Sequence, residues 1–312
     1  MGDLPAWMIL ASGLFAPSRG YSTLVRPGSD ALVERVAAIF ADVTGTRVED
    51  PNAPLELSPL AWTEFALALE QAFGVRLDDR RGLRTIAEAA ETVSERQGQP
   101  SPEPSLHPAT GRLQGLARAI VRPPLRSYFG LVVRGADRLP RSGAVVLAAN
   151  HESMWDIPVL AVASPRPIVF MAEEGVLGSP LASWFFTRLG SFPVRRGGGD
   201  LRAIRAALTV VRSQHVLGIY PEGTRGRGVL LPFRTGAAWI ALTSGAPLMP
   251  AGISGTEDVI SGRISVPRRA RLHVTFGEPI TVAREPNPRR RLDQASDLTD
   301  RLRSEVERLI RR

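Results

Sequence analysis

The chain has 312 residues, of which 44% are hydrophobic, and its formal net charge at neutral pH is +8. This length and composition exclude a disordered polypeptide and allow more than one domain, while the absence of cysteine excludes disulfides, thiol catalysis and thiolate metal sites. All 39 basic side chains are arginines, which suit phosphate and carboxylate groups, and the positive charge favours an anionic partner: a nucleic acid, a membrane surface or a phosphorylated substrate.

Residues 1–29 form a predicted N-terminal tail. Its apolar stretch, LPAWMILASGLFAP, is shorter than the run of about 18 apolar residues that a membrane-spanning helix needs, and it lacks the basic leader of a signal peptide. We therefore expect any membrane contact of this chain to be interfacial, with apolar side chains lying in the surface of a bilayer.

Residues 30–96 predict a small helical domain. The segments DALVERVAAIFADVTG and PLAWTEFALALEQAFG carry apolar residues at helical spacing, and the second ends at Gly74, a favoured helix stop. A shorter helix, TIAEAAETVSERQ, follows. Residues 97–115 begin with a stretch rich in proline, serine and glycine, which predicts a linker before a second domain at 116–312.

Residues 116–312 predict an α/β domain. The runs AVVLAAN, PIVFMA, VLGIYPEG and APLMPAGI are typical of buried strands that end in loops, and helical stretches separate them. The alternating segment ARLHVTFGEPI predicts a later strand. This order indicates a mixed, largely parallel sheet flanked by helices, in which functional residues lie in loops after the carboxyl ends of the strands.

The segment LDQASDLTDRLRSEVERLIRR, at 292–312, predicts an amphipathic C-terminal helix with an arginine-rich face. Its apolar stripe has two candidate environments, the α/β domain and a membrane surface. The pattern leaves both open because each environment requires only an apolar stripe.

The stretch NHESMWD, directly after the first predicted strand, places His151 five residues before Asp156. A neutral histidine takes a proton from a hydroxyl when a carboxylate holds its other ring nitrogen. Five residues turn about 140° around a helix, so the pair can meet only if His151 lies in the loop and Asp156 in the first helical turn. Ser153 can cap that helix, but S-x-x-D is also an ordinary capping pattern, so this stretch alone leaves catalysis and capping open.

A second strand-end block, YPEGTRGRG at 220–228, combines glycines that free backbone amides with the hydroxyl of Thr224 and the guanidinium of Arg225. Such groups suit an anion. The stretch GSFPVRRGGGD at 190–200 adds paired arginines, either as a second anion contact or as a solvated turn. The run PLMPAGISGTE is a third apolar strand that enters a loop of small residues.

Together these blocks resemble the glycerolipid acyltransferase family, whose best known members acylate lysophosphatidic acid. The resemblance covers roughly residues 116–282. The family's Asn-His-x4-Asp block matches Asn150, His151 and Asp156. Its Phe-Pro-Glu-Gly-Thr-Arg block is matched, with Tyr220 in place of phenylalanine, by Pro221, Glu222, Gly223, Thr224 and Arg225. Two looser blocks are approximated by Gly190, Phe192 and Arg195, and by Met249 and Pro250.

The resemblance implies an acyltransferase in which His151 is the general base on an acceptor hydroxyl and Asp156 orients it. The hydroxyl would attack an acyl thioester, either acyl-CoA or an acyl carrier protein, without an enzyme-bound acyl intermediate. The implied phosphate contacts are Arg195 and Arg225. The residues implied to shape the site are Asn150, Ser153, Pro221, Glu222, Gly223, Thr224 and Pro250. No metal or cofactor is expected beyond the acyl donor.

The resemblance also implies a lipid acceptor and a peripheral position on the cytoplasmic face of the cell membrane. One departure bears on the acceptor: Glu173 stands where the family often has lysine. An anion there weakens phosphate binding, so a lyso-aminolipid or another hydroxylated molecule is an alternative acceptor. A non-catalytic module that binds lipid or carrier protein is a further alternative, whereas nucleic-acid binding has no motif to support it.

Residues 30–96 resemble an acyl carrier protein, through the stretch ELSPLAWTEFALALEQAFGVRLDDRRGLRTIAEAAETV. Carriers attach phosphopantetheine to the serine of an Asp-Ser-Leu block. Pro59 stands at that serine position here, and Ser58 stands where the aspartate is expected. We therefore expect a degenerate carrier that cannot be charged, with modification of Ser58 after a slip of one residue as the alternative.

Overall fold

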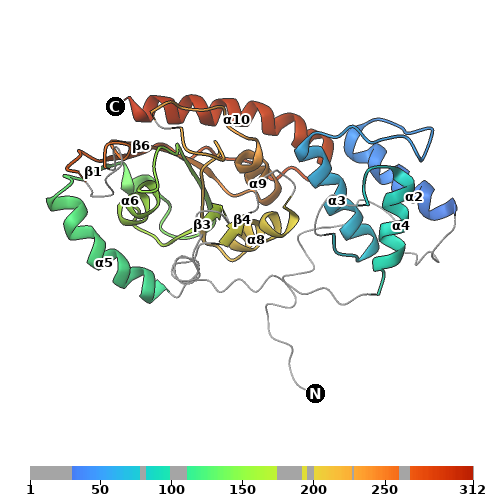
Figure 1. Ribbon diagram of the computed structural model, residues 1–312, viewed down its shortest axis with the longest axis horizontal. Helices are drawn as coiled ribbons and strands as arrows, with labels where there is room; N and C mark the ends of the chain where they lie inside the picture. Colours follow the sequence, from blue (N-terminus) through green and yellow to red (C-terminus); the bar gives the residue numbers. More distant parts are fainter. Residues whose placement is uncertain are drawn as a thin grey trace, which may run out of the picture.

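The computed structural model describes residues 30–77, 82–98, 111–173, 192–194, 200–226, 228–259 and 268–311 (Figure 1). The predicted tail at 1–29 and most of the predicted linker lie outside these residues. In Figure 1 a small helical unit lies at one end of the molecule and the long helix α5 at the other, with the sheet between them.

The helical unit contains α2 (Asp30–Thr44), α3 (Pro59–Phe73) and α4 (Ile86–Arg96), so the three predicted helices are present. They enclose a core in which the rings of Phe40 and Phe65 meet edge to face at 5.4 Å. The Ser58 hydroxyl accepts the Ala61 N–H and Pro59 follows it, which is a favourable helix start. The same helix ends at Gly74, whose φ of 67° is a left-handed conformation that favours glycine.

The rest of the chain forms one α/β domain. Its elements are α5 (Gly111–Ser127), β1 (Val132–Arg134), the 3-10 helix η1 (Ala136–Arg138), β2 (Val145–Ala149), α6 (Asp156–Ala163), β3 (Ile168–Glu173), β4 (Phe192–Val194), α8 (Leu201–Arg212), β5 (Val216–Ile219), α9 (Gly236–Ser244), β6 (Leu248–Ser254), β7 (His273–Phe276) and α10 (Pro288–Ile310). The helix α5 begins at Gly111, so its first five residues, GRLQG, lie within the stretch predicted as the linker.

The seven strands form one sheet in the order β1-β7-β6-β2-β5-β3-β4. All neighbouring pairs are parallel except β6 and β7, which confirms the predicted mixed, largely parallel sheet. The central strand β2 is fully buried along its length, as expected for an apolar run covered on both faces. Helices α8, α9 and α10 pack on one face, and α5 and α6 on the other.

The C-terminal helix α10 lies along the α/β domain (Figure 1). Its apolar stripe is buried against that domain. Leu302 and Val306 are buried in the same core as Trp239 of α9. Gly252 of β6 allows a close approach, because a Cβ there would lie 2.7 Å from the backbone of Leu309. Of the two predicted environments for this stripe, packing on the α/β domain is the one observed. None of the helices that the structure describes is long and apolar enough to cross a membrane.

A buried ion pair joins the helical unit to the α/β domain. Glu64 of α3 accepts hydrogen bonds from the guanidinium of Arg291 of α10 and from the indole N–H of Trp239. Nη2 of Arg291 lies 2.6 Å from Oε2 of Glu64. Glu64 and Arg291 are 2% and 6% exposed, so both charges are removed from water. A second pair, between Glu70 and Arg205 of α8, lies nearby on the same junction. The two units are therefore fastened to each other by matched buried charges.

Replacing Glu64 by glutamine is expected to lower the free energy of unfolding by about 3–5 kcal/mol, because the buried guanidinium of Arg291 then lacks a carboxylate. Urea denaturation of the whole chain measures this difference. The matched control is Glu305→Gln, which breaks an exposed pair with Arg308 on α10 and is expected to cost less than about 1 kcal/mol. Equal midpoints for Glu64→Gln and the unmodified chain would contradict the role given to this pair.

Candidate active site

The candidate site lies where β2, β5 and β6 end. These three strands are adjacent and parallel, so the loops that follow them meet at one edge of the sheet. His151 follows β2, Glu222 follows β5, and Thr256 follows β6. The structure therefore brings together the two strand-end blocks that the sequence separates by about 70 residues.

The imidazole of His151 contacts the carboxylate of Asp156, with 2.8 Å between Nδ1 and Oδ2. His151 lies in the loop and Asp156 is the first residue of α6, which is the arrangement that the spacing predicted. Asp156 is fully buried, whereas the His151 side chain is 15% exposed. When the Nδ1–H group donates its hydrogen bond to this carboxylate, Nε2 of the neutral ring is left as the proton acceptor.

Asp156 is surrounded by hydrogen-bond donors. Its Oδ2 also accepts the backbone N–H groups of Glu152 at 2.7 Å and Ser153 at 2.8 Å, and its Oδ1 accepts the hydroxyl of Thr256. The start of a helix stabilises a negative charge at this place. These contacts occupy both carboxylate oxygens and fix the rotation of the carboxylate toward His151.

Ser153 differs from its predicted place. It was expected to be the N-cap of the helix, but α6 begins at Asp156 and Trp155 precedes it without a side-chain cap. The Ser153 hydroxyl accepts only a long contact of 3.4 Å from the Trp155 N–H, and its backbone N–H goes to Asp156. The reason is that the Asp156 carboxylate caps the turn itself, so the residue that holds the histidine also starts the helix.

Glu222 holds the backbone of His151. Its Oε1 accepts the His151 N–H at 2.6 Å, and its Oε2 accepts the Leu231 N–H at 2.9 Å. The Gly226 N–H in turn donates to the His151 carbonyl at 2.7 Å. Burial raises the pKa of the Glu222 carboxyl, and the nearby negative charge of Glu152 adds to this, while the two backbone N–H groups lower it. The PEGTRG block therefore fixes the backbone of the loop that carries His151.

The other residues of this block lie at the mouth of the site. Gly223 has a φ of 69°, and a Cβ there would lie 2.8 Å from Arg234, so glycine is required. Thr224, Arg225 and Arg234 are exposed. The predicted contact Arg195 lies outside the described residues, as does Gly190.

Asn150, Pro221 and Pro250 shape the strand ends. The Asn150 side chain donates to the Ile253 carbonyl at 2.9 Å and accepts the Ile253 N–H at 2.7 Å, which joins the ends of β2 and β6. The carbonyl of Pro221 accepts the Arg234 N–H at 2.8 Å. Pro250 is buried in β6 and its carbonyl accepts the Gly277 N–H at 2.8 Å.

Three contributors were not predicted from the sequence: Thr256, Glu152 and the ring of Tyr220. Glu152 is buried, and it accepts the Gly228 N–H with one oxygen while the other faces the Asn150 amide. The Tyr220 ring stacks on His151. The usable signal for Thr256 was its position directly after the third strand-end run, since loops after parallel neighbours converge.

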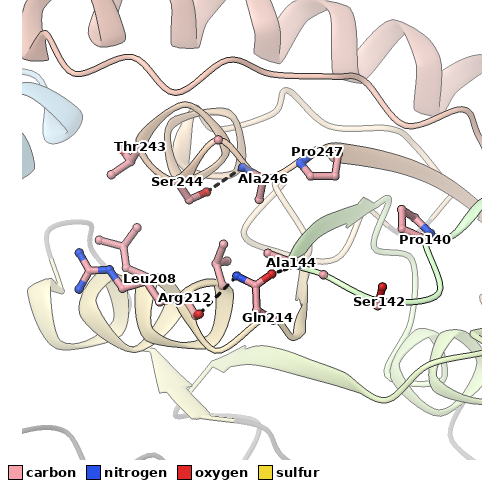
Figure 2. A pocket seen from close by; sticks show the side chains of 13 residues that line it. Pro140, Ser142, Ala144, Leu208, Arg212, Gln214, Thr243, Ser244, Ala246 and Pro247 are labelled. Carbon is pink, nitrogen blue, oxygen red and sulfur yellow. Dashed lines mark hydrogen bonds between the residues drawn. The ribbon is translucent and has the colours of Figure 1, made fainter. Parts of the chain in front are cut away.

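A cavity of about 420 Å³ lies elsewhere (Figure 2). Its lining includes Ala144, Gln214 and Pro247, which lie within two residues of the first residues of β2, β5 and β6. It therefore opens at the amino ends of the strands, the opposite edge of the sheet from His151. Within the described part of the chain, no group of three or more histidine, aspartate or glutamate side chains could hold a metal ion.

The sequence of the chain is similar to known acyltransferases. Residues 130–254 match the protein-family model described as Acyltransferase. The chain is 33% identical over 167 residues to the lyso-ornithine lipid O-acyltransferase of Pseudomonas aeruginosa, a match that covers 47% of this chain and 63% of that protein. It is 28% identical over 152 residues to the 1-acyl-sn-glycerol-3-phosphate acyltransferase of Bacillus subtilis, with 48% and 74% covered.

Among solved structures, the 1-acyl-sn-glycerophosphate acyltransferase PlsC from Thermotoga maritima is similar, with a TM-score of 0.49 and 19% identity over 80% of this chain and 95% of that one. The chain spans 63% of the length of the Pseudomonas relative, so it corresponds to part of that protein. The range that matches the Acyltransferase family model, residues 130–254, lies in the α/β domain and includes His151, Asp156 and Glu222.

Proposed function

We propose that this protein transfers a fatty acyl group from an acyl thioester to a hydroxyl of a lysophospholipid, such as lysophosphatidic acid. The observation that carries the proposal is the 2.8 Å contact between His151 Nδ1 and the buried Asp156 carboxylate, at a strand end within the residues that match the Acyltransferase family model. The acyl donor is acyl-CoA or an acyl carrier protein. No metal or further cofactor takes part in the proposed reaction.

The geometry supports direct transfer. Nε2 of His151 removes the proton of the acceptor hydroxyl as its oxygen attacks the thioester carbonyl carbon, forming the C–O bond. The tetrahedral intermediate then expels the thiolate, which breaks the C–S bond, and the thiolate takes the proton from the imidazolium. Asp156 stabilises that imidazolium through Nδ1. Proton transfer of this kind contributes about 10²–10⁴-fold to the rate.

The main test is product analysis by mass spectrometry with acyl-CoA and acyl-carrier donors of several lengths and a panel of lysolipid acceptors. His151→Ala is expected to lower kcat by at least about 10²-fold while the circular dichroism stays unchanged, because the hydroxyl loses its base. The matched control is His215→Ala, which removes an exposed histidine beyond α8 and should leave turnover unchanged.

Turnover of His151→Ala at the level of the unmodified chain would overturn the proposed mechanism. If the unmodified chain neither transfers nor hydrolyses any acyl group in this panel, the alternative of a non-catalytic lipid- or carrier-binding module replaces the proposal. Acyl release to water without transfer would instead indicate a thioesterase.

A second acceptor, a lyso-aminolipid, is favoured by the charges near His151. Burial raises the pKa of the carboxyls of Glu222 and Glu257, and the negative charge of Glu152 adds to it in both cases. This excess of carboxylates suits a cationic headgroup better than a phosphate. Glu173, in place of a lysine common in the family, ends β3 beside β4, and the Pseudomonas relative is named for a lyso-ornithine lipid. The same panel separates the two acceptors.

We further propose that the protein works as a peripheral enzyme on the cytoplasmic face of the membrane and that α5 lies against the bilayer. Leu116 and Ile120, one helical turn apart, are 59% and 66% exposed. The helix also carries exposed Arg122 and Arg126 and has no acidic residue in its sequence. Exposed apolar side chains beside arginines suit a surface of anionic lipids.

The double substitution Leu116→Glu and Ile120→Glu is expected to weaken binding to anionic vesicles by about tenfold or more, because two apolar side chains no longer enter the bilayer surface. Co-sedimentation with vesicles that contain phosphatidylglycerol measures this. Ser296→Glu with Ser304→Glu adds the same charge at exposed positions of α10 and serves as the control. Equal loss in both double variants would mean that net charge alone drives binding.

For the helical unit we propose a degenerate carrier that cannot be charged. The Ser58 hydroxyl is engaged as the cap of α3, and the ion pair of Glu64 fastens the same helix to the α/β domain. A working carrier must move its prosthetic arm between sites, which a fastened unit does not do.

Incubation of the whole chain with CoA and a phosphopantetheinyl transferase is therefore expected to leave its intact mass unchanged, while an active carrier protein in the same tube gains the prosthetic group. The variant Ser58→Ala distinguishes two roles of the Ser58 hydroxyl, as the cap of α3 and as the attachment point of phosphopantetheine. It should cost about 1 kcal/mol of stability without any change in labelling. Labelling that disappears in Ser58→Ala would establish the opposite, namely a carrier charged on Ser58.

A further inference from the structure

Tyr220 directly follows β5 and precedes Glu222 by two residues, and its ring faces the imidazole of His151. The ring centroids are 4.3 Å apart and the planes differ by 20°. Asp156 therefore holds one edge of the imidazole through Nδ1 while Tyr220 covers one of its faces. Together these two contacts leave the Nε2 edge as the part of the ring that can reach a substrate.

A second aromatic ring from the sheet lies parallel to Tyr220. The ring of Phe170, from β3, lies nearly parallel to that of Tyr220, with centroids 6.1 Å apart and planes at 6°. Phe170 pairs in register with Gly218 of β5, and a Cβ on Gly218 would lie 2.7 Å from the Phe170 ring. Glycine at 218 therefore makes room for the Phe170 ring that lies parallel to Tyr220.

We propose that Tyr220 is a positioning residue of the acyl-transfer reaction: its ring fixes the plane of the His151 imidazole and stabilises the cation that His151 becomes when it accepts the hydroxyl proton. The face of an aromatic ring attracts a cation more strongly than a neutral group, especially where water is excluded. This role rests on the proposed function, in which His151 is the base.

The groups around the imidazole fit this role. Asp156 faces it from α6, while Glu152 and Glu222 lie on the loops after β2 and β5. Glu257 and Asp258 lie on the loop after β6, near Glu152, and Arg225 is exposed farther along the loop of Glu222. The only aromatic face stacked on His151 among the residues that the structure describes is that of Tyr220.

The ring of Tyr220, and not its hydroxyl, carries the contact. Its Oη is buried and finds no hydrogen-bond partner among the described atoms. Burial raises the pKa of this phenol well above its usual range, and the Asp156 charge raises it further, so the side chain stays neutral. A phenylalanine at 220 would keep the stacked face.

The test compares Tyr220→Phe with Tyr220→Leu. Loss of the aromatic face is expected to lower kcat by between about twofold and thirtyfold, with KM little changed, because the cation forms only during the reaction. The acid limb of the pH–rate profile is expected to move to lower pH in the leucine variant, since the protonated ring has lost stabilisation. Tyr220→Phe is expected to keep the kcat and the profile of the unmodified chain.

A second measurement does not depend on activity. The chain has four histidines, so the ring signals of His151 in an ¹⁵N NMR titration are identified by their loss in His151→Ala. The pH of half protonation should fall by about half a unit or more in Tyr220→Leu and stay in place in Tyr220→Phe. This reading holds even if the acyl-transfer assignment fails, which His151→Ala tests by itself.

Unchanged kcat and titration in a folded leucine variant would overturn the inference, and so would equal losses in the leucine and phenylalanine variants. Circular dichroism shows whether Tyr220→Leu folds. If it does not, Gly218→Ala replaces it, because the added methyl group displaces the side chains of Ile168 and Phe170, and Phe170 lies against Tyr220. A titration shift in the same direction then supports the role of the ring, and an unshifted titration contradicts it.

Discussion

The burial of the Asp156 carboxylate is the constraint on which the rest of the site depends. A negative charge removed from water is tolerated only if donors replace its hydration. Here the donors come from the loop after β2, from the imidazole and from Thr256 beyond β6. Satisfying this one carboxylate therefore fixes the distance between two strand ends and the orientation of the histidine.

The carboxylate of Glu222 holds the backbone of the loop that carries His151 in a similar way. One carboxylate spans the N–H groups of His151 and Leu231, so the loop after β5 cannot move without releasing the histidine loop. Burial raises the pKa of this carboxyl, which means that its negative charge is kept at a cost to stability as the pH rises. The glutamate of the PEGTR block is in this way a structural partner of the histidine, not a separate feature.

Much of the fold could be predicted from the sequence because strands and helices leave local periodic patterns. The runs that became β2, β5 and β6 are continuous and apolar, and their order along the chain implies parallel neighbours. The meeting of His151 with Asp156 could be predicted because both lie in one short stretch. The contact of Thr256 with Asp156 joins residues 100 positions apart, and an isolated threonine has no periodicity to mark it.

Other misses have equally physical reasons. The sequence predicted that Ser153 caps α6, because serine is a common helix cap. In the structure the Asp156 carboxylate, which also contacts His151, accepts the backbone N–H of Ser153 instead. The apolar stripe of α10 could not reveal which apolar surface would cover it. Glu64 stands among the apolar residues of α3 and has the pattern of an ordinary solvated position, since its partner Arg291 lies 227 residues away.

Exposed large apolar side chains are distributed unevenly over the surface. Several lie on or next to α5, among them Leu116 and Ile120, and two others, Met154 and Val229, lie in the loops that carry His151 and Glu222. Exposed apolar side chains of this kind mark candidate interaction surfaces. Met154 and Val229 place two of them at the strand-end edge of the sheet, where His151 lies.

The buried pair of Glu64 and Arg291 has a consequence for how the chain can be divided. A boundary drawn at the proline-rich segment separates two units by sequence, yet Leu201 of α8 sits in the core of the helical unit and Leu60 of α3 packs on the core of the α/β domain. Removal of residues 1–110 would take away the helical unit that covers Arg291 and Trp239. A buried guanidinium and a buried indole ring would then face water. The sequence contains two modules, but in the folded molecule the two units share packed side chains and a buried ion pair.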